Sequence, residues 1–316
     1  KANSNKNNGV SIKNLTKKLE LSNEQIMKSI DKLKSLYSIN DKDTNNIYFA
    51  NSHIDRSFPL EFDSGLNHIN SDAYYYENID STNSFFKILM IKDNIKHGSV
   101  IVTEHQTKGR GQKNRLWEDK PFLSLLLSVF LKLNMNISNL LLLSPTIGLA
   151  VSETIVKHCS LDTEIKWPND IYVSGRKCAG ILVESSVLQS NIENAIIGIG
   201  INANYQEDDL PQNIKNLATS LRIETGIINN RMKILNELLV HLDNYLTMLF
   251  EGRNEEIANK VSKILHHRGN VVIYKDTRYM IDSINTKGEL VLINMSNNEE
   301  KIAISSAGDL EYAYGN

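Results

Sequence analysis

The sequence predicts an α+β protein made of three regions, and three observations favour that fold class. Apolar residues recur at helical spacing in two short segments before residue 50. Strand-like and helical segments are interleaved between residues 73 and 260, and five short strands follow residue 268. Because the middle region mixes strands with segregated helices, we expect a central mixed β-sheet with helices on one face.

The composition is that of an ordinary globular protein. Of the 316 residues, 41% are hydrophobic and 23% are charged, and the net charge is -2. This charge favours neither nucleic acid nor an anionic membrane, so a DNA-binding role would need a local basic patch.

Cysteine usage and apolar runs indicate the compartment. Cys159 and Cys178 are too few for a disulfide framework and lie in no Cys/His cluster, which predicts reduced thiols, a cytoplasmic protein and no zinc site. The most apolar run, residues 122–133, is shorter than a membrane span, so we expect no membrane segment. The N-terminus has neither a signal-peptide pattern nor an initiating Met, which we interpret as a trimmed or partly disordered start.

Residues 1–50 have the outline of a winged helix-turn-helix. The apolar positions of the first helix are Ile12, Leu15 and Leu19. Ser22 is the expected N-cap of a second helix, because its side chain can accept a hydrogen bond from the first turn. The apolar stripe of that helix consists of Ile26, Ile30, Leu33 and Leu36. Two strands at 37–39 and 47–49 around a polar turn at 40–46 are expected next, and residues 51–72 are expected to be a linker.

Residues 73–267 form the large central region. Its strand-like segments are 98–103, 123–131, 164–167, 171–173, 179–184 and 195–202. One helix is expected to begin at Pro145 with Ser144 as its cap. Residues 230–250 predict a long amphipathic helix. Its apolar positions are Ile234, Leu235, Leu238, Leu239, Leu242, Tyr245, Leu246 and Leu249.

Residues 268–316 have a different pattern. Five short strands are expected at 271–274, 278–285, 290–294, 301–305 and 310–313, with polar residues at the turns. Strands of this number and length predict a small β-barrel, roughly the size of an SH3 domain.

Residues 109–115 form a basic, glycine-rich loop. Its two glycines let backbone amides approach a ligand closely, and its three cations can neutralise phosphate charge. The loop has neither the GK[ST] of a P-loop nor the third glycine of the dinucleotide fingerprint. Taken alone, an ordinary solvated loop is the simpler interpretation. Trp117 is either a core anchor or a wall on which a base stacks.

Residues 166–170, Lys-Trp-Pro-Asn-Asp, stand at the end of a strand. A lysine after an apolar strand is costly unless it meets an anion, and Asn169 and Asp170 add two polar side chains. The alternative is a surface lysine followed by a turn. Gly180, Gly198 and Gly200 in the following strands either leave room for a flat ligand against the sheet or mark bulges.

Four motifs join these features in one order along the chain. They are DSTN at 80–83, EHQTKGRGQKNRLW at 104–117, KWPNDIYVSGRKCAGILVE at 166–184 and GIGIN at 198–202. In this order and spacing they resemble the biotin protein ligases. With the helix-turn-helix in front, the chain resembles the bifunctional ligase and biotin-operon repressor. The resemblance implies a class II synthetase-like catalytic fold for residues 73–267, a winged helix before it and an SH3-like domain after it.

The resemblance also implies an activity. Such enzymes join biotin to ATP as biotinyl-5′-adenylate and then transfer the biotinyl group to one lysine of the biotin carboxyl carrier protein of acetyl-CoA carboxylase. Biotin is then a substrate, used with ATP and Mg²⁺. The enzyme has to hold two anions in line, which is mostly a positioning and electrostatic task.

Roles for single residues follow from the resemblance. Lys166 would lie at the biotin carboxylate and α-phosphate, and Asp170 is a candidate to deprotonate the acceptor lysine. The residues expected to be catalytic are Lys166, Arg110 and Asp170. The residues expected to bind biotin are Ser81, Thr82, Asn83, Gln106, Arg110, Gly111, Gln112 and Lys166. Those expected to bind ATP are Arg115, Trp117, Asn169 and Asn202, and no metal ligand is assigned. The loop around Arg110 would act as a lid that excludes water.

Two residues of the loop depart from the family pattern. Gln112 stands where relatives usually carry a second basic residue, and Asn114 replaces a glycine. Either Lys113 supplies the missing charge or the adenylate is held less tightly. We expect an intermediate that leaks faster than in a relative with arginine at position 112.

The helix over residues 23–36 is the candidate recognition helix. Lys28, Lys32 and Lys34 suit contacts with DNA phosphates. The helix has no arginine, so base readout by Arg–guanine pairs is absent. The resemblance implies a ligand-linked homodimer on biotin operator DNA, and a retained domain with weak or lost DNA binding is the alternative.

Two other functions stay open. A lipoate–protein ligase shares the catalytic fold and the adenylate chemistry, although KWPND and GRGQKNR fit biotin better. A biotin-sensing transcriptional regulator with weak ligase activity would have a degenerate site, and the intact Lys166 and Arg110 argue against it.

Overall fold

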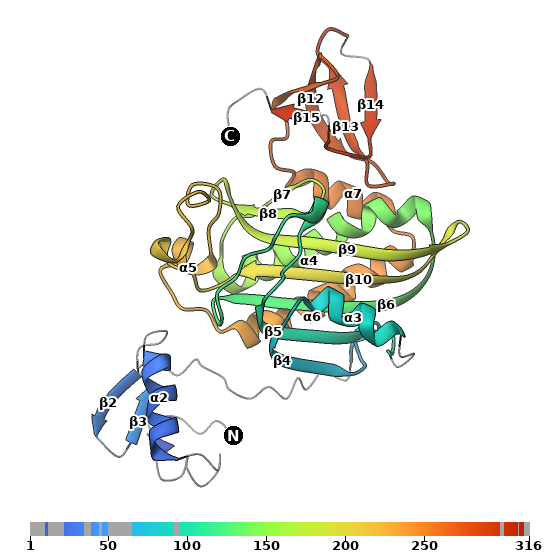
Figure 1. The fold of residues 1–316 in the computed structure, drawn as a ribbon. Coiled ribbons are helices and arrows are strands. Elements are labelled where there is room, and N and C mark those ends of the chain that lie inside the picture. Colours follow the sequence, from blue (N-terminus) through green and yellow to red (C-terminus); the bar gives the residue numbers. More distant parts are fainter. Residues whose placement is uncertain are drawn as a thin grey trace. The chain divides into compact units, whose positions relative to one another are not determined.

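Figure 1 shows the computed structural model of the chain. It describes residues 10–11, 22–34, 39–43, 46–49, 65–91, 95–297, 300–308 and 310–312. The chain divides into two compact units, Lys1–Phe58 and Pro59–Asn316.

The described part of the first unit contains helix α2 (Asn23–Lys34) and a three-stranded antiparallel sheet of order β1-β3-β2. The strands are β1 (Val10–Ser11), β2 (Ile39–Asp43) and β3 (Asn46–Phe49). Ser22 caps α2 as predicted. Its Oγ accepts from the Gln25 N–H at 3.2 Å, and Gln25 Oε1 accepts from the Ser22 N–H at 2.9 Å.

The structure tests the predicted turn at 40–46 but not the predicted first helix of this unit. The sequence predicts a turn over residues 40–46, but β2 extends to Asp43 and pairs with β3 there, so that prediction is wrong. Pairing with a partner strand outweighs the turn preference of single Asn and Asp residues. The expected helix with Ile12, Leu15 and Leu19 lies outside the described residues.

The second unit is built around a seven-stranded sheet of order β4-β5-β6-β10-β9-β8-β7. β4 and β5 are parallel, and the other neighbouring pairs are antiparallel, which confirms a mixed sheet. The strands are β4 (Ala73–Ile79), β5 (Ser99–Gln106), β6 (Ser124–Asn136), β7 (Glu164–Lys166), β8 (Asp170–Val173), β9 (Arg176–Leu188) and β10 (Asn191–Asn202).

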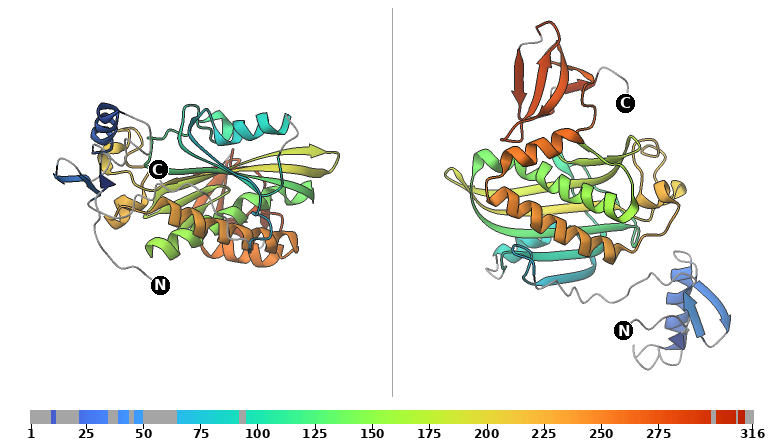
Figure 2. Two further views of the ribbon diagram at one scale, coloured as in Figure 1. Left: turned by 90° about the horizontal axis from the view of Figure 1, so that it is seen from below. Right: turned by 180° about the vertical axis from the view of Figure 1, so that it is seen from behind.

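Helices cover both faces of this sheet, as Figure 2 shows, although the sequence predicts them on one face. One face carries α4 (Leu140–Cys159), α6 (Arg231–Phe250) and α7 (Asn254–Lys263), and the other carries α3 (Thr82–Ile91). Phe86 of α3 is fully buried against Ile101 and Phe130 of the sheet, which explains the second layer. The short helices are η1 (Gln112–Asn114), η2 (Ile137–Asn139), η3 (Glu207–Asp209) and α5 (Leu221–Thr225).

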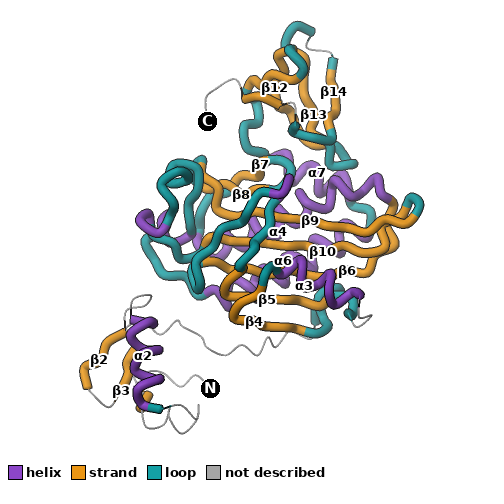
Figure 3. The backbone as a smooth tube through the Cα atoms, in the orientation of Figure 1, coloured by secondary structure: helices purple, strands orange, loops and turns teal. Residues whose placement is uncertain are grey.

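α6 confirms the predicted amphipathic helix, because all of its predicted apolar positions are buried. Its buried Asp243 accepts hydrogen bonds from the backbone N–H groups of Asn67, His68 and Ile69 at 2.9, 2.6 and 3.1 Å. Residues 67–69, which the sequence predicts to be linker, are therefore fastened to α6. Figure 3 shows the helices in purple beside the strands of the large sheet in orange.

α4 begins at Leu140, so the prediction that it starts at Pro145 is wrong. Leu142 and Leu143 in its first turns are fully buried, and their burial outweighs the hydrogen bond that Pro145 cannot make. The stretch Ile137–Cys159 is long and apolar enough to cross a membrane, but 67% of its most apolar window is buried inside the protein, as in a core helix.

The five strands that the sequence predicts after residue 268 are present as one antiparallel sheet of order β14-β13-β12-β11-β15. They are β11 (Val271–Tyr274), β12 (Thr277–Ile284), β13 (Leu290–Asn294), β14 (Lys301–Ile304) and β15 (Leu310–Tyr312). Trp167, just after β7, donates from its Nε1 to Gly288 O at 2.8 Å. This bond fastens the turn between β12 and β13 to the large sheet.

Candidate active site

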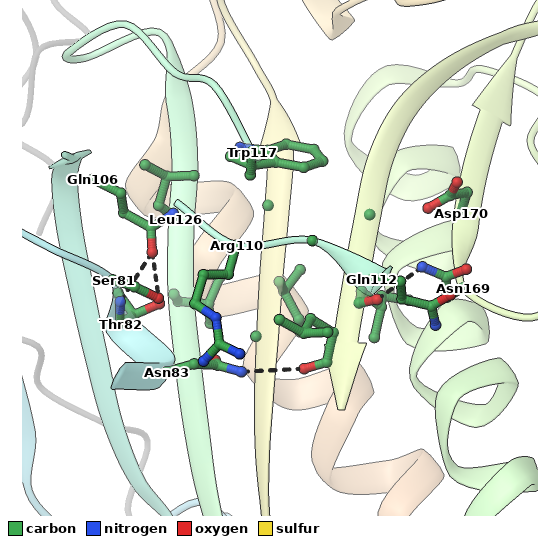
Figure 4. A pocket seen from close by; sticks show the side chains of 18 of the residues that line it. Ser81, Thr82, Asn83, Gln106, Arg110, Gln112, Trp117, Leu126, Asn169 and Asp170 are labelled. Carbon is green, nitrogen blue, oxygen red and sulfur yellow. Dashed lines mark hydrogen bonds between the residues drawn. The ribbon is translucent and has the colours of Figure 1, made fainter. Parts of the chain in front are cut away.

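A cavity lies where the start of α3, the loop after β5 and strands β6, β8, β9 and β10 meet (Figure 4). The predicted site residues that line it are Ser81, Thr82, Asn83, Gln106, Arg110, Gly111, Gln112, Trp117, Asn169 and Asp170. The other lining residues are Leu126, Leu127, Lys177, Gly180, Ile181, Leu182, Gly198, Ile199 and Gly200.

One wall of the cavity consists of buried neutral polar groups that hold one another in place. Gln106 Oε1 accepts from the Thr82 backbone N–H at 2.9 Å and from its hydroxyl at 3.2 Å. Ser128 Oγ lies 2.6 Å from both Thr82 Oγ1 and Asn83 Oδ1. Preoriented donors and acceptors without charge suit an uncharged polar ring.

The loop over residues 109–117 closes on itself beside this wall. Arg110 and Leu116 form an isolated antiparallel bridge, and the Trp117 N–H donates to Gly109 O at 3.0 Å. The loop is therefore a short hairpin whose Arg110, Gly111 and Gln112 line the cavity. Its tip stays exposed to solvent at Lys113 and Arg115.

Glycines in β9 and β10 make room for side chains above the sheet. Gly180 and Gly200 are paired across the two strands, and a Cβ atom on either would lie 2.8 or 2.7 Å from the Trp117 ring. A Cβ atom on Gly198 would lie 2.5 Å from Asn83 Oδ1. The Trp117 ring packs over Gly180 and Gly200, so room for a flat ligand at these glycines stays a prediction.

Lys177 is a cation that the sequence interpretation omits. It lines the cavity, and its Nζ lies 2.7 Å from Asp170 Oδ1 and 5.5 Å from the centroid of the Trp117 ring. The β8–β9 hairpin brings it there, because Asp170 pairs with Gly180 and Tyr172 with Lys177. The sequence did contain a signal for this residue. Lys177 lies just before the predicted strand that carries Gly180, which lines the cavity.

Lys166 is not among the residues that line the cavity, and its place at the substrate stays a prediction. Its Nζ donates to Tyr172 Oη at 3.3 Å and lies 5.1 and 5.0 Å from the ring centroids of Tyr172 and Tyr312. Burial lowers the pKa of Lys166, and the charge of Asp170 opposes that shift. The charge of Asp170, two aromatic faces and a phenol surround this cation.

Two residues predicted to bind ATP also lie outside the lining. Asn202 is 9% exposed, and its Nδ2 donates to Thr219 O at 3.0 Å, so it holds a neighbouring segment in place. Arg115 is exposed where the loop returns to the sheet. Its contact with ATP phosphates stays a prediction.

A buried carboxylate fastens the root of the loop. Asp119 has a fully buried side chain, and its Oδ1 lies 2.6 Å from His105 Nδ1. Its Oδ2 accepts from the Gln106 backbone N–H at 3.1 Å. Burial raises the pKa of Asp119, and the bonds from His105 and Gln106 oppose that rise. The segment after the loop is thus tied to the residue that orients Thr82.

The described residues contain no group of three or more His, Cys, Asp and Glu side chains that could hold a metal ion. A metal at this site would therefore need ligands from a substrate as well as from the protein.

Residues 75–202 match the model of the biotin/lipoate A/B protein ligase family. This segment contains most of the wall, the loop and the glycine-bearing strands around the cavity. The match is to this segment of the chain, and the large sheet with its helices has the biotin ligase catalytic fold.

The individual proteins that this chain resembles include ligase/repressors and a biotin protein ligase. The bifunctional ligase/repressor BirA of Bacillus spizizenii is 32% identical over 165 residues, which are 52% of this chain and 51% of that protein. BirA of Escherichia coli is 32% identical over 165 residues, 52% of this chain and 46% of that protein. The chain spans about half the length of the curated relatives it matches. The biotin protein ligase from Aquifex aeolicus, solved in complex with biotin and ATP, is similar with a TM-score of 0.66 and 27% identity over 78% of this chain and 100% of that chain.

Proposed function

We propose that this protein is an ATP-dependent biotin–[acetyl-CoA-carboxylase] ligase. It would join biotin to ATP as biotinyl-5′-AMP and transfer biotin to one lysine of a biotin carboxyl carrier protein. The observation that carries the proposal is a cavity with a buried neutral polar wall and a lysine, lined by a basic glycine-rich loop. Biotin has a neutral ureido ring at one end and a carboxylate at the other, so each end finds a matching group. The names of the relatives support the same activity.

The wall would hold the ureido ring. The residues proposed for this contact are Ser81, Thr82, Asn83 and Gln106. Lys177 would meet the carboxylate and the α-phosphate, in place of Lys166, and cancel the repulsion between the two anions. Arg110, Gly111 and Gln112 would cover biotin and the adenylate, because the loop that carries them lines the cavity.

ATP would bind beside Trp117, whose ring is a flat wall for the base, and near Asn169. Asp170 fits the Mg²⁺ that the family implies, because this carboxylate lines the cavity and Mg²⁺ is commonly held by one or two carboxylates together with substrate phosphates. When bound, the ion would neutralise charge on the phosphates. Asp170 also stays the candidate base for the acceptor lysine.

We also propose a DNA-binding role for residues 1–50 as a winged helix-turn-helix, acting as a ligand-linked homodimer on biotin operator DNA. α2 carries Lys28, Lys32 and Lys34 and is followed by β2 and β3, which is the order of a recognition helix and a wing. Lys28 pairs with Glu24 at 3.1 Å in an exposed ion pair that a phosphate can replace. The repressor names of the relatives support this role.

The proposed arrangement of domains follows from these roles. Residues 51–72 would connect the DNA-binding domain to the catalytic domain at 73–267, and residues 268–316 would form an SH3-like C-terminal domain. The protein would work in the cytoplasm, where carboxylase carrier proteins and operator DNA are both present.

The deciding experiment is a carrier assay with the full chain, biotin, ATP and Mg²⁺. We expect one biotinyl group on one carrier lysine, detected by mass spectrometry, and none without ATP. Adenylate without carrier product would indicate a biotin sensor with weak ligase activity. Stabilisation by lipoate instead of biotin in a thermal unfolding comparison would indicate a lipoate–protein ligase.

A further inference from the structure

Glu184 on β9 lies just outside the cavity lining, yet it binds two residues that line it. Arg110 of the loop reaches both of its carboxylate oxygens, with Nη2 at 3.0 Å from Oε1 and Nη1 at 3.4 Å from Oε2. Asn83 Nδ2 donates to Oε2 at 2.9 Å, and Lys87 of α3 donates to Oε1 at 2.7 Å. One carboxylate thus joins the loop, the polar wall and the sheet.

The surroundings of Glu184 make this carboxylate a strong partner for Arg110. Burial raises the pKa of Glu184, but the bonds from Lys87 and Asn83 and the charges of Lys87 and Arg110 outweigh burial and lower it. Its side chain is 17% exposed, against 37% for Arg110. A two-pronged arginine–carboxylate pair at this depth is stronger than an exposed ion pair. Figure 4 shows the Arg110 side chain extending from the loop toward Asn83.

We propose that Glu184 is a positioning residue that latches the loop at 109–117 over the cavity through Arg110, and so controls how long an acyl-adenylate stays bound. The proposal rests on the proposed ligase function. Glu184 touches no substrate in this role. Without it the charge that faces the reacting groups, Lys177, stays in place, but the loop opens and the adenylate meets water and diffuses away.

Glu184→Gln keeps the side-chain length and an oxygen for Asn83, but it removes the charge that Arg110 binds. In the full chain with biotin, ATP and Mg²⁺, we expect single-turnover adenylate formation to change by less than about threefold, while adenylate release becomes about tenfold faster or more, as for the loss of a charge-assisted hydrogen bond. Lys87→Gln is the matched control, because it removes the other cation on the same carboxylate. It should release adenylate at the wild-type rate.

A double variant tests whether the two residues act through each other. Arg110→Gln combined with Glu184→Gln should release adenylate no faster than the faster single variant, because the shared contact is lost only once. The latch is overturned if the two effects multiply, if Glu184→Gln releases adenylate at the wild-type rate, or if Lys87→Gln has as large an effect.

Limited trypsin digestion of the free protein separates the latch from the enzymatic function. Lys113 and Arg115 are exposed cleavage sites within the loop. We expect trypsin to cut Glu184→Gln in the loop several times faster than wild type, and Lys87→Gln at the wild-type rate. Both variants should unfold at the same temperature as wild type. Equal cleavage of all three proteins overturns the latch. Faster cleavage of Glu184→Gln, with no adenylate formed by the wild type, rejects the ligase proposal and supports the latch.

Discussion

Two lysines of the same motif, Lys166 and Lys177, meet different surroundings in the folded chain. Lys177 faces the cavity beside Asp170, at an Nζ–Oδ1 distance of 2.7 Å. Lys166 lies over the rings of Tyr172 and Tyr312. A cation stabilises developing charge only if it lies close to the reacting groups. We therefore expect Lys177 to act in adenylate formation and Lys166 to contribute little to it.

Lys177→Ala is therefore expected to slow adenylate formation by about 10²–10³-fold, the effect of removing one preorganised charge from a reacting centre. Lys166→Ala should keep most of the wild-type rate. Pyrophosphate release with biotin and ATP measures both, and Lys177→Arg controls for charge. A rate lost in Lys166→Ala but kept in Lys177→Ala would support the sequence prediction that Lys166 acts at the substrate.

Gln112 lines the cavity from η1, at the position where the resemblance predicts a basic residue. Gln112→Arg is expected to slow adenylate release by about tenfold, because an added charge close to the phosphate strengthens its retention. Release is timed after trapping the protein with biotin and ATP. Lys113→Ala serves as the comparison, since it speeds release if Lys113 supplies the missing charge. Equal release from wild type and Gln112→Arg would refute the idea.

At the scale of elements, two glycines of β10 each leave room for one side chain at the floor of the cavity. Gly200 accommodates Trp117, and Gly198 accommodates Asn83 two residues earlier on the same face. Successive side chains of a strand alternate between faces, so both glycines face the ligand side.

Gly200→Ala should displace Trp117 and raise the KM for ATP by about tenfold, whereas Gly198→Ala should displace Asn83 and raise the KM for biotin, because an added methyl group forces the neighbour to move. Steady-state kinetics with each substrate varied in turn measures the difference. If both variants raised both KM values equally, the division of the floor would be wrong.

The root of the loop depends on Asp119, which joins it to the end of β5. Asp119→Ala leaves His105 and the Gln106 N–H without their partner, and the free energy of unfolding should fall by about 1–3 kcal/mol. Denaturant unfolding measures this change. The exposed pair of Lys120 and Asp209 supplies a control nearby, and Lys120→Ala should cost less than about 1 kcal/mol. A loss no larger than that of the control would show that Asp119 does not fasten the loop.

For the whole molecule, the net charge of -2 means that DNA affinity has to come from the local charges of α2. Binding to a palindromic operator should weaken with salt, with a log–log slope of roughly -3 per protomer for three phosphate contacts, and should strengthen with biotin plus ATP. Fluorescence anisotropy over a salt series measures both. If the operator affinity did not depend on salt, or if no binding were detected, the domain would be one that has been retained without specific DNA binding.

The fold was largely predictable because its signals are local. The apolar stripe of α6, the cap at Ser22 and the short strands after residue 268 each arise from side chains a few residues apart. Predictions failed where packing decided. α4 starts before Pro145 because buried leucines extend it, and α3 forms a second layer because Phe86 packs on the sheet.

By itself, the sequence determined the four motifs, their order and hence most of the residues that line the cavity, because spacing along the chain sets which residue types stand at the ends of neighbouring strands. Only the tertiary structure decided which lysine faces the cavity and what holds the loop. Lys166 rests on Tyr312 of a distant strand, and Arg110 binds Glu184 at a separation of 74 residues. The partners of a charged side chain depend on which residues the fold brings close to it. Spacing along the chain predicts such contacts only between residues a few positions apart.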